Sequence, residues 1–367
     1  MAKLKSEQFL KDLRIYDAIS KQPIQPPIIK CPTDLVLLDH DKTMTYKADP
    51  KRVMLSHFLH PWAAEILKEG LARGFSFAIC STAHVTRLIR QYRDGITDRD
   101  LLNRLVIIAE GGSVFAIPEL REGLYYDLYE IEIPPELICA RETVEKVVNE
   151  FRRRRNLDVF VNRDLKRHIT VENFEGKREI TDELVRIIRE ALNEDSLLDK
   201  IWLTTTTNSI EVNVHSLKEN VVEILSCYDF GNIVSIGDSR SDIPVFKRTF
   251  GIQVPYRDMN IDEISPLEHA RVIAIGSEAG GTTTAQLLMH MLEEEKLMHI
   301  DYEDFKRTIS DALRNGFIHT ETISASAIRL DYTFPDALRS KYYDSQSQSE
   351  SLLKQIYPSL DFLSGRA

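Results

Sequence analysis

The segment from Leu35 to Thr45, LVLLDHDKTMT, restricts the fold more than any other part of this chain. Its leading apolar residues lack helical spacing and run directly into Asp39, and Asp41 follows two positions later. A short apolar run that ends in turn-forming residues is typical of a buried strand. In open α/β sheets ligands bind just beyond the carboxyl ends of the strands, so both acids are expected where chemistry takes place.

Two carboxylates at the end of a buried strand need an explanation, because like charges removed from water are costly unless a cation neutralises them. One interpretation is a Mg²⁺ site beside a carboxylate nucleophile. The other is an ordinary transition from strand to loop with solvated acids, since aspartate is common in turns. This segment alone does not separate the two interpretations.

The composition excludes several classes of protein. The chain has 367 residues, 43% of them hydrophobic and 28% charged, which fits one large globular domain or two smaller ones. Its net charge of −10 argues against binding to nucleic acid or to an anionic membrane surface, because both need clustered Lys and Arg. The scattered cysteines, the lack of a membrane-length apolar run and the charged N-terminus together predict a cytoplasmic protein.

The order of the apolar patterns predicts an α/β fold with an inserted domain. Strand and helix patterns alternate over residues 34–117 and again over 215–295, which indicates a Rossmann-like parallel sheet. Residues 118–214 are instead typical of an α+β cap domain. Residues 1–33 are expected to form a helical arm and an extended lead-in. Residues 296–367 form a C-terminal extension and are a candidate for contacts in a homo-oligomer.

A second acidic cluster favours the interpretation of a metal site. Another apolar strand pattern, ending at Ile236, runs into GDSRSD, which contains Asp238 and Asp242. If a helix starts here, these acids share one face of it. Two strands would then deliver carboxylates to one sheet edge, and Mg²⁺ prefers hard oxygen ligands. Lys218, expected in the first turn of a helix, would supply a compact positive charge.

These motifs resemble those of the haloacid-dehalogenase-like phosphatases. The resemblance lies in DHDKT at Asp39 to Thr43, Thr82 at the end of a strand, Lys218, and GDSRSD at Gly237 to Asp242, in the order of that family. The inserted block resembles the large α+β cap of the subgroup with sucrose-phosphate and trehalose-phosphate phosphatases and phosphomannomutases. The resemblance covers roughly residues 34–295.

The resemblance assigns roles to the acids of the first motif and to the residues after the next strand. Asp39 matches the nucleophile that forms an aspartyl-phosphate. Asp41 matches the general acid and base, which protonates the leaving oxygen and then activates water. Thr82 matches the phosphate-binding hydroxyl, and Ala83 is the adjoining phosphate-binding position.

The remaining matches concern charge. Lys218 matches the cation that steadies both the nucleophile and the phosphoryl group. Asp238 matches a Mg²⁺ ligand, together with Asp39 and the backbone carbonyl of Asp41. Asp242 matches a supporting acid, which binds the metal in some members and the lysine in others. The resemblance therefore implies Mg²⁺ as cofactor and a small phosphorylated metabolite, with a sugar phosphate favoured, as substrate.

Several positions depart from the family pattern and leave the substrate open. Lys42 replaces a usual glycine, Ala83 and His84 replace a frequent Gly-Arg pair, and Ser241 replaces a common asparagine. None of these changes removes a reacting group.

A polar turn in the cap is a further candidate for substrate contact. It contains Arg163, Lys166, Arg167 and His168, which could bind a second anionic group of the substrate. The alternative is a solvated hairpin.

Two alternatives to a phosphatase also stay open. One is a phosphomutase of the phosphomannomutase type. The other is a non-catalytic protein that binds a phosphorylated ligand or a partner, although a retired site has no reason to keep both acids of the first motif.

Overall fold

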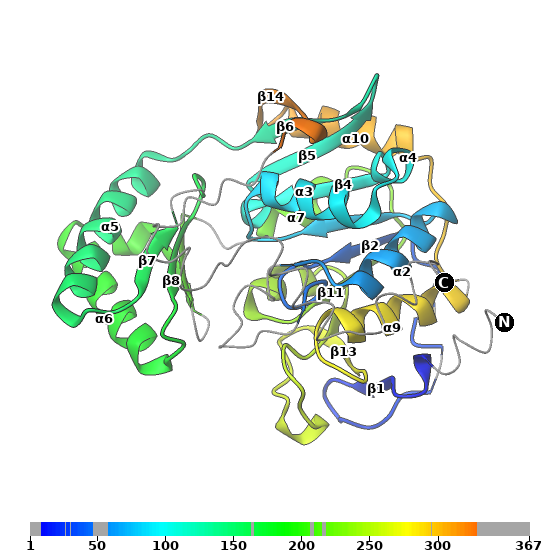
Figure 1. The fold of residues 1–367 in the computed structure, drawn as a ribbon, viewed down its shortest axis with the longest axis horizontal. Coiled ribbons are helices and arrows are strands. Elements are labelled where there is room, and N and C mark those ends of the chain that lie inside the picture. The colour runs from blue at the N-terminus through cyan, green and yellow to red at the C-terminus, as the bar shows by residue number, and fades with distance from the viewer. Residues whose placement is uncertain are drawn as a thin grey trace.

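The computed structural model describes residues 9–25, 27–29, 31–46, 58–162, 165–205, 209–214, 218–294 and 296–328. These residues form a core around a ten-stranded sheet and a cap around a four-stranded sheet. Figure 1 shows the two parts side by side, with the cap helices farthest from the core. Within the described residues, no helix has the length and apolar character needed to cross a bilayer.

The large sheet is parallel at its centre and antiparallel at its edges. The strand order is β1-β13-β12-β11-β2-β3-β4-β5-β6-β14, and the strands from β13 to β4 run parallel. Its strands are β1 (Arg14–Asp17), β2 (Leu35–Leu38), β3 (Phe77–Cys80), β4 (Leu105–Ala109), β5 (Val114–Leu120), β6 (Leu124–Glu130), β11 (Ile233–Gly237), β12 (Phe250–Gln253), β13 (Ala270–Ile275) and β14 (Ile318–Ser324). Every residue of β2 is buried, as expected of a central parallel strand covered on both faces.

Helices cover both faces of this sheet. Apolar side chains of α2, α3 and α9 pack on one face, and those of α7 and α10 pack on the other. The helices of the core are α2 (Pro61–Ala72), α3 (Val85–Ile96), α4 (Arg99–Leu102), α7 (Glu219–Leu225), α8 (Ile243–Phe246), α9 (Gly281–Glu293) and α10 (Tyr302–Leu313). This is the doubly wound architecture that the alternating pattern predicts, and the α/β fold class is confirmed.

The cap packs two helices on one face of its sheet. The strand order is β7-β8-β10-β9, and all neighbours are antiparallel. The elements are α5 (Pro135–Arg155), β7 (Val159–Asn162), β8 (Ile169–Asn173), α6 (Arg178–Glu194), β9 (Trp202–Thr205) and β10 (Ser209–Asn213). The chain enters the cap from β6 and returns to the core before α7.

Three segments differ from the sequence expectations, each through its strand pairing in the large sheet. Strand β6, expected in the cap block, pairs with β5 in the large sheet, so the cap begins after Glu130. Residues Arg14–Asp17, expected in a helix, form β1 and pair with β13. The described part of the C-terminal extension belongs to the core, because α10 covers the sheet and β14 pairs with β6. The sequence also predicts a helix over Ser349 to Ile356, and these residues lie outside the described part of the chain.

Candidate active site

Three carboxylates meet at one edge of the large sheet. Strands β2 and β11 are parallel neighbours, with Leu38 opposite Ile236, so Asp39 and Asp238 leave the sheet side by side. Carboxylate oxygens of Asp39, Asp238 and Asp242 lie within 4.8 Å of one another. All three residues are buried. The structure thus brings Asp39 of the first motif together with both acids of the second.

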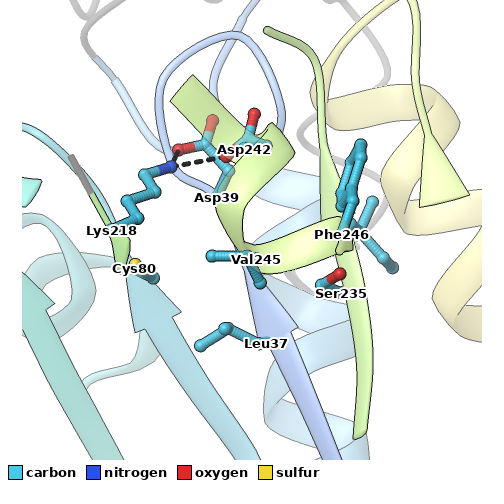
Figure 2. A pocket seen from close by; sticks show the side chains of 9 residues that line it. Leu37, Asp39, Cys80, Lys218, Ser235, Asp242, Val245 and Phe246 are labelled. Atoms are coloured by element: carbon cyan, nitrogen blue, oxygen red, sulfur yellow. Dashed lines mark hydrogen bonds and ion pairs between the residues drawn. The ribbon is translucent and has the colours of Figure 1, made fainter. Parts of the chain in front are cut away.

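Lys218 joins two of these acids. Its Nζ atom donates to Oδ1 of Asp39 at 2.5 Å and to Oδ1 of Asp242 at 2.6 Å, as Figure 2 shows. Thr43 Oγ1 donates to the other oxygen of Asp39 at 3.1 Å. The lysine side chain is 1% exposed. Because both oxygens of Asp39 have a donor, its carboxylate is held in a defined orientation.

The backbone of Lys218 is placed by the turn after β4. Lys218 lies just before α7 rather than in its first turn as expected, and it has a left-handed φ of 63°. Its N–H donates to the carbonyl of Gly111 at 2.6 Å. Gly112 has a φ of 93°, and a Cβ atom there would lie 2.8 Å from a methyl group of Val221. The paired glycines therefore let α7 and its lysine approach the sheet.

Asp242 reaches the site from a short 3₁₀ helix, Arg240–Asp242. The expected sharing of one helix face by Asp238 and Asp242 is wrong, because Asp238 precedes this helix and follows β11 directly. A Cβ atom on Gly237 would lie 2.4 Å from the carboxyl group of Asp242. Glycine is thus required for Asp242 to fold back over the strand end.

The site holds more buried carboxyl groups than positively charged side chains. Burial, reinforced by Asp242, raises the pKa of Asp39 above its usual range although Lys218 opposes the shift. Burial raises the pKa of Asp238 to about 7. Burial alone would lower the pKa of Lys218, but Asp242 and Asp39 raise it above its usual value, so the lysine is charged. Three buried carboxylates therefore share one charged lysine.

The donor set fits Mg²⁺. The oxygens gathered by Asp39, Asp238 and Asp242 are hard ligands at a separation that one small cation can bridge. A divalent cation would also neutralise the charge that Lys218 leaves uncompensated. Asp41 was expected to bind the metal through its backbone carbonyl, and this role stays a prediction.

A small cavity lies behind the carboxylates, on the side of the sheet interior. Figure 2 shows Leu37, Cys80, Val245 and Phe246 around it, with Lys218 and the acids at one end. Burial raises the pKa of the Cys80 thiol to about 12, so this cysteine is a neutral part of the lining. These side chains give the reactive groups an apolar support that excludes water from behind them.

Helix α3 holds the loop that carries Asp41. Arg87 on this helix forms an ion pair with Asp41. Four residues later Gln91 Oε1 accepts a hydrogen bond from His40 Nε2 at 2.6 Å, and the hydroxyl of Tyr92 lies 3.1 Å from Nδ1 of the same ring. The side chain of His40 is buried and is held by these two residues of α3.

Thr82 and Ala83 lie at the same edge of the sheet, directly after β3. Because β3 is the parallel neighbour of β2, Thr82 is level with the loop after Asp39. The N–H of Ala83 donates to Ser81 Oγ at 3.0 Å and is therefore already engaged. Helix α3 starts at Val85, with His84 at its N-cap. Phosphate binding by Thr82 and Ala83 stays a prediction.

The polar turn of the cap is not a solvated hairpin. Arg167 and His168 are buried, whereas Lys166 is exposed and Arg163 lies outside the described residues. Arg167 forms an ion pair with Glu130 and donates to a backbone carbonyl. The guanidinium of Arg167 is thus committed to the junction with the core.

Glu110 binds this turn to the core. One oxygen of its carboxylate accepts the backbone N–H groups of Lys166 and Arg167 at 3.1 and 2.9 Å. Its other oxygen lies 3.7 Å from Nε2 of His84. Because Glu110 is 1% exposed, the contact is shielded from water.

The sequence analysis did not predict that Arg87 pairs with Asp41 or that Glu110 binds the cap turn. The spacing of Arg87 and Gln91, one helical turn apart, places both on one face of α3 and was the available signal. For Glu110, an acid in front of two glycines, no local pattern indicates that it binds a turn of the cap.

No protein-family model and no curated protein matches the sequence, but solved structures match the fold. The C-terminal domain of the Candida albicans trehalose synthase regulatory protein aligns with a TM-score of 0.50 at 11% identity, over 71% of this chain and 94% of that one. Aspergillus fumigatus trehalose-6-phosphate phosphatase aligns with a TM-score of 0.40 at 15% identity, over 77% and 94%.

Plasmodium falciparum IMP-nucleotidase aligns with a TM-score of 0.42 at 14% identity, over 58% of this chain. The match spans 56% of the nucleotidase, little more than half of its length. At these identities the likeness concerns the fold alone, which is the haloacid-dehalogenase-like fold with a cap.

Proposed function

We propose that this chain, with its haloacid-dehalogenase-like fold, is a Mg²⁺-dependent phosphatase acting on a small phosphorylated metabolite, with a sugar phosphate as the favoured substrate. The observation that carries the proposal is the buried ammonium of Lys218 between Asp39 and Asp242, with the Asp238 carboxylate beside them. Phosphoryl transfer depends on positioning and charge neutralisation, and this arrangement provides both.

In the proposed reaction an oxygen of Asp39 attacks the phosphorus atom, and the bond between phosphorus and the ester oxygen breaks. Asp41 donates a proton to the leaving oxygen. A water molecule then attacks the aspartyl-phosphate while Asp41 accepts its proton, which releases phosphate and restores Asp39. Lys218 orients Asp39 throughout and offsets negative charge. When bound by the three acids, Mg²⁺ supplies further positive charge for the phosphoryl oxygens.

The ion pair between Arg87 and Asp41 agrees with the role of Asp41 in the second step. Arg87 favours the carboxylate form of Asp41, which is the form that accepts a proton from water in the second step. Rotation of Asp41 toward the substrate would break this pair, so we expect the ion pair to belong to the substrate-free enzyme.

The test is the hydrolysis of p-nitrophenyl phosphate with Mg²⁺ and with excess EDTA. We expect release of p-nitrophenol that requires Mg²⁺ and falls at least about a thousandfold in Asp39→Asn. Asp311→Asn is the matched control, because Asp311 is an exposed acid of α10 paired with Arg314. Turnover that survives Asp39→Asn would reject the nucleophile assignment.

Two further outcomes separate the alternatives. A phosphomutase would need a bisphosphate activator and would release little phosphate. A non-catalytic protein would bind phosphorylated compounds without turnover. A panel of phosphorylated metabolites, with released phosphate as the readout, then ranks the substrates.

A further inference from the structure

Lys42 has a backbone conformation that lysine rarely adopts. Its φ angle is 64°, in the left-handed region that favours glycine. The surrounding loops fix this conformation, because the N–H of Lys42 donates to Thr45 Oγ1 at 2.8 Å and its carbonyl oxygen would lie 2.9 Å from a Cβ atom on Gly280. Glycine would occupy the position without strain, and strained residues of this kind concentrate at functional sites. The side chain of Lys42 therefore needs an explanation.

The ammonium group of Lys42 is open to a ligand. Within the residues that the structure describes, its Nζ atom has no hydrogen bond and no ion pair, and it lies 5.9 Å from the centre of the Tyr256 ring. Lys218, in contrast, uses two of its three donors on Asp39 and Asp242. Lys42 thus offers a compact positive charge whose donors are not taken up by these parts of the protein.

Lys218 reaches the acids from one side of the site. The strand order across the site is β12, β11, β2, β3 and β4, and Asp238 and Asp39 follow the inner strands β11 and β2. The N–H of Lys218 is bonded to Gly111 after β4, and Figure 2 shows its side chain above Cys80 at the end of β3. Lys218 therefore approaches from the side of β3 and β4.

Lys42 lies on the other side, although it follows Asp41 in the first motif. Gly280, which packs against the carbonyl oxygen of Lys42, precedes α9 and donates to the carbonyl of Pro255 at 3.2 Å. Pro255 and Tyr256 follow β12. The backbone of Lys42 and its ammonium group are thus both next to the loops after β12 and β13.

The charges in the site agree with this placement. Burial raises the pKa of Asp238 to about 7, and Lys42 is the strongest of the charged groups that oppose the shift. An anion bound over the acids would therefore have an ammonium group on each side.

We propose that Lys42 is a catalytic residue that binds a phosphoryl oxygen of the substrate on the side opposite Lys218. The inference rests on the proposed function and adds a residue to its site. Phosphoryl oxygens carry negative charge throughout the transfer, and positive groups fixed around them lower its barrier. The glycine that is usual at this position supplies no such charge, so the contact is not part of the family pattern.

The kinetic test separates charge from backbone conformation. Lys42→Met removes the charge and keeps the length of the side chain, and should lower kcat/KM for p-nitrophenyl phosphate about ten- to hundredfold. Lys42→Arg keeps the charge and should retain most of the turnover. Lys42→Gly should lose as much turnover as Lys42→Met, yet raise the equilibrium constant of folding by up to about fivefold because it relieves the strain. A structural residue would not combine a gain in stability with a loss of turnover.

Lys21→Gly is the matched control. Lys21 is another lysine with a left-handed φ, of 55°, and it lies in the turn after β1. Because β1 runs antiparallel to β13, this turn is at the edge of the sheet away from the acids. We expect Lys21→Gly to show wild-type kcat/KM.

Calorimetry provides a readout that does not depend on turnover. In an Asp39→Asn background, inorganic phosphate should bind at least about tenfold more weakly when Lys42→Met is added. With Asp39 intact, binding of Mg²⁺ alone should be unchanged or a few-fold tighter in Lys42→Met, because the substitution removes a positive charge near the acids. A damaged site would bind both ions more weakly.

The outcomes separate this inference from the proposed function. Wild-type kcat/KM and wild-type phosphate affinity in Lys42→Met would overturn the role of Lys42 and leave the phosphatase assignment intact. Parallel losses of Mg²⁺ affinity, phosphate affinity and stability would show that Lys42 only supports the loop. Absence of any Mg²⁺-dependent hydrolysis by the wild type would reject the proposed function, and this inference with it.

Discussion

The two sides of the candidate active site differ in how completely their charges are paired. On the core side Lys218 bonds both Asp39 and Asp242, and Thr43 bonds the remaining oxygen of Asp39. On the cap side Glu211 is buried without such partners among the described residues. The acids of the core side are thus held by fixed donors, whereas the cap side carries a buried carboxyl group without such partners.

The largest expected effect tests the preorganised side. Lys218→Met should lower the free energy of unfolding by about 3–5 kcal/mol, because it leaves buried carboxylates without their cation. It should also reduce phosphate release at least about a thousandfold. Urea unfolding at pH 7 and p-nitrophenyl phosphate turnover measure the two effects.

Lys306→Met is the matched control for this substitution. Lys306 is another buried lysine, but it lies on α10 and its ion-pair partner Glu303 is 73% exposed. We expect a smaller loss of stability and nearly normal turnover. Equal losses of turnover in the two variants would show that Lys218 has only a structural role.

Addition of Mg²⁺ tests the acid cluster on the core side of the site. A cation that binds only the folded state at a hundred times its Kd stabilises it by about 2.7 kcal/mol. We expect this gain in a thermal melt of wild type and its near absence in Asp238→Asn. Without Mg²⁺, Asp238→Asn should be at least as stable as wild type because it removes repulsion. An undiminished gain in the variant would contradict the metal assignment.

A substitution at the junction between cap and core should cost less stability than the loss of Lys218 from the acid cluster. Glu110→Gln replaces a carboxylate that accepts the N–H groups of Lys166 and Arg167, and should cost about 2–3 kcal/mol. Hydrogen exchange of residues 165–168 should become faster. Glu119→Gln is the control, because its pair with Arg121 is exposed and should contribute little. Unchanged exchange in Glu110→Gln would mean that other contacts hold the turn.

The smallest effect concerns acid sensitivity of the cap turn. Burial lowers the pKa of His168 to about 3, so the folded protein keeps this ring neutral while the unfolded chain takes up a proton below about pH 6.5. Stability should therefore fall with pH below 6.5, by roughly 2 kcal/mol at pH 5 from this residue.

His168→Gln should remove that part of the pH dependence. Urea unfolding at pH 7 and pH 5 gives the comparison, and the difference between the two pH values should be smaller in the variant than in wild type. His60, whose pKa burial also lowers to about 3, remains in both proteins and keeps part of the dependence. An identical pH dependence would show that His168 accepts a proton in the folded protein.

The two parts of the chain were not equally predictable. The apolar runs that end in Asp39 and Asp238 are local signals, and they correctly predicted parallel strands that deliver acids to one edge. Strands β1 and β14 were missed because each depends on pairing with a strand far away in the chain.

The sequence by itself determined which residue types end the core strands, and with them the chemistry of the site, because strand-terminal acids need only a parallel sheet to meet. The tertiary structure alone decided that Lys218 is held in a left-handed turn by Gly111 and that Glu110 binds the cap. It also decided that Glu211 is buried. These features depend on contacts between residues more than fifty positions apart, which no local pattern encodes.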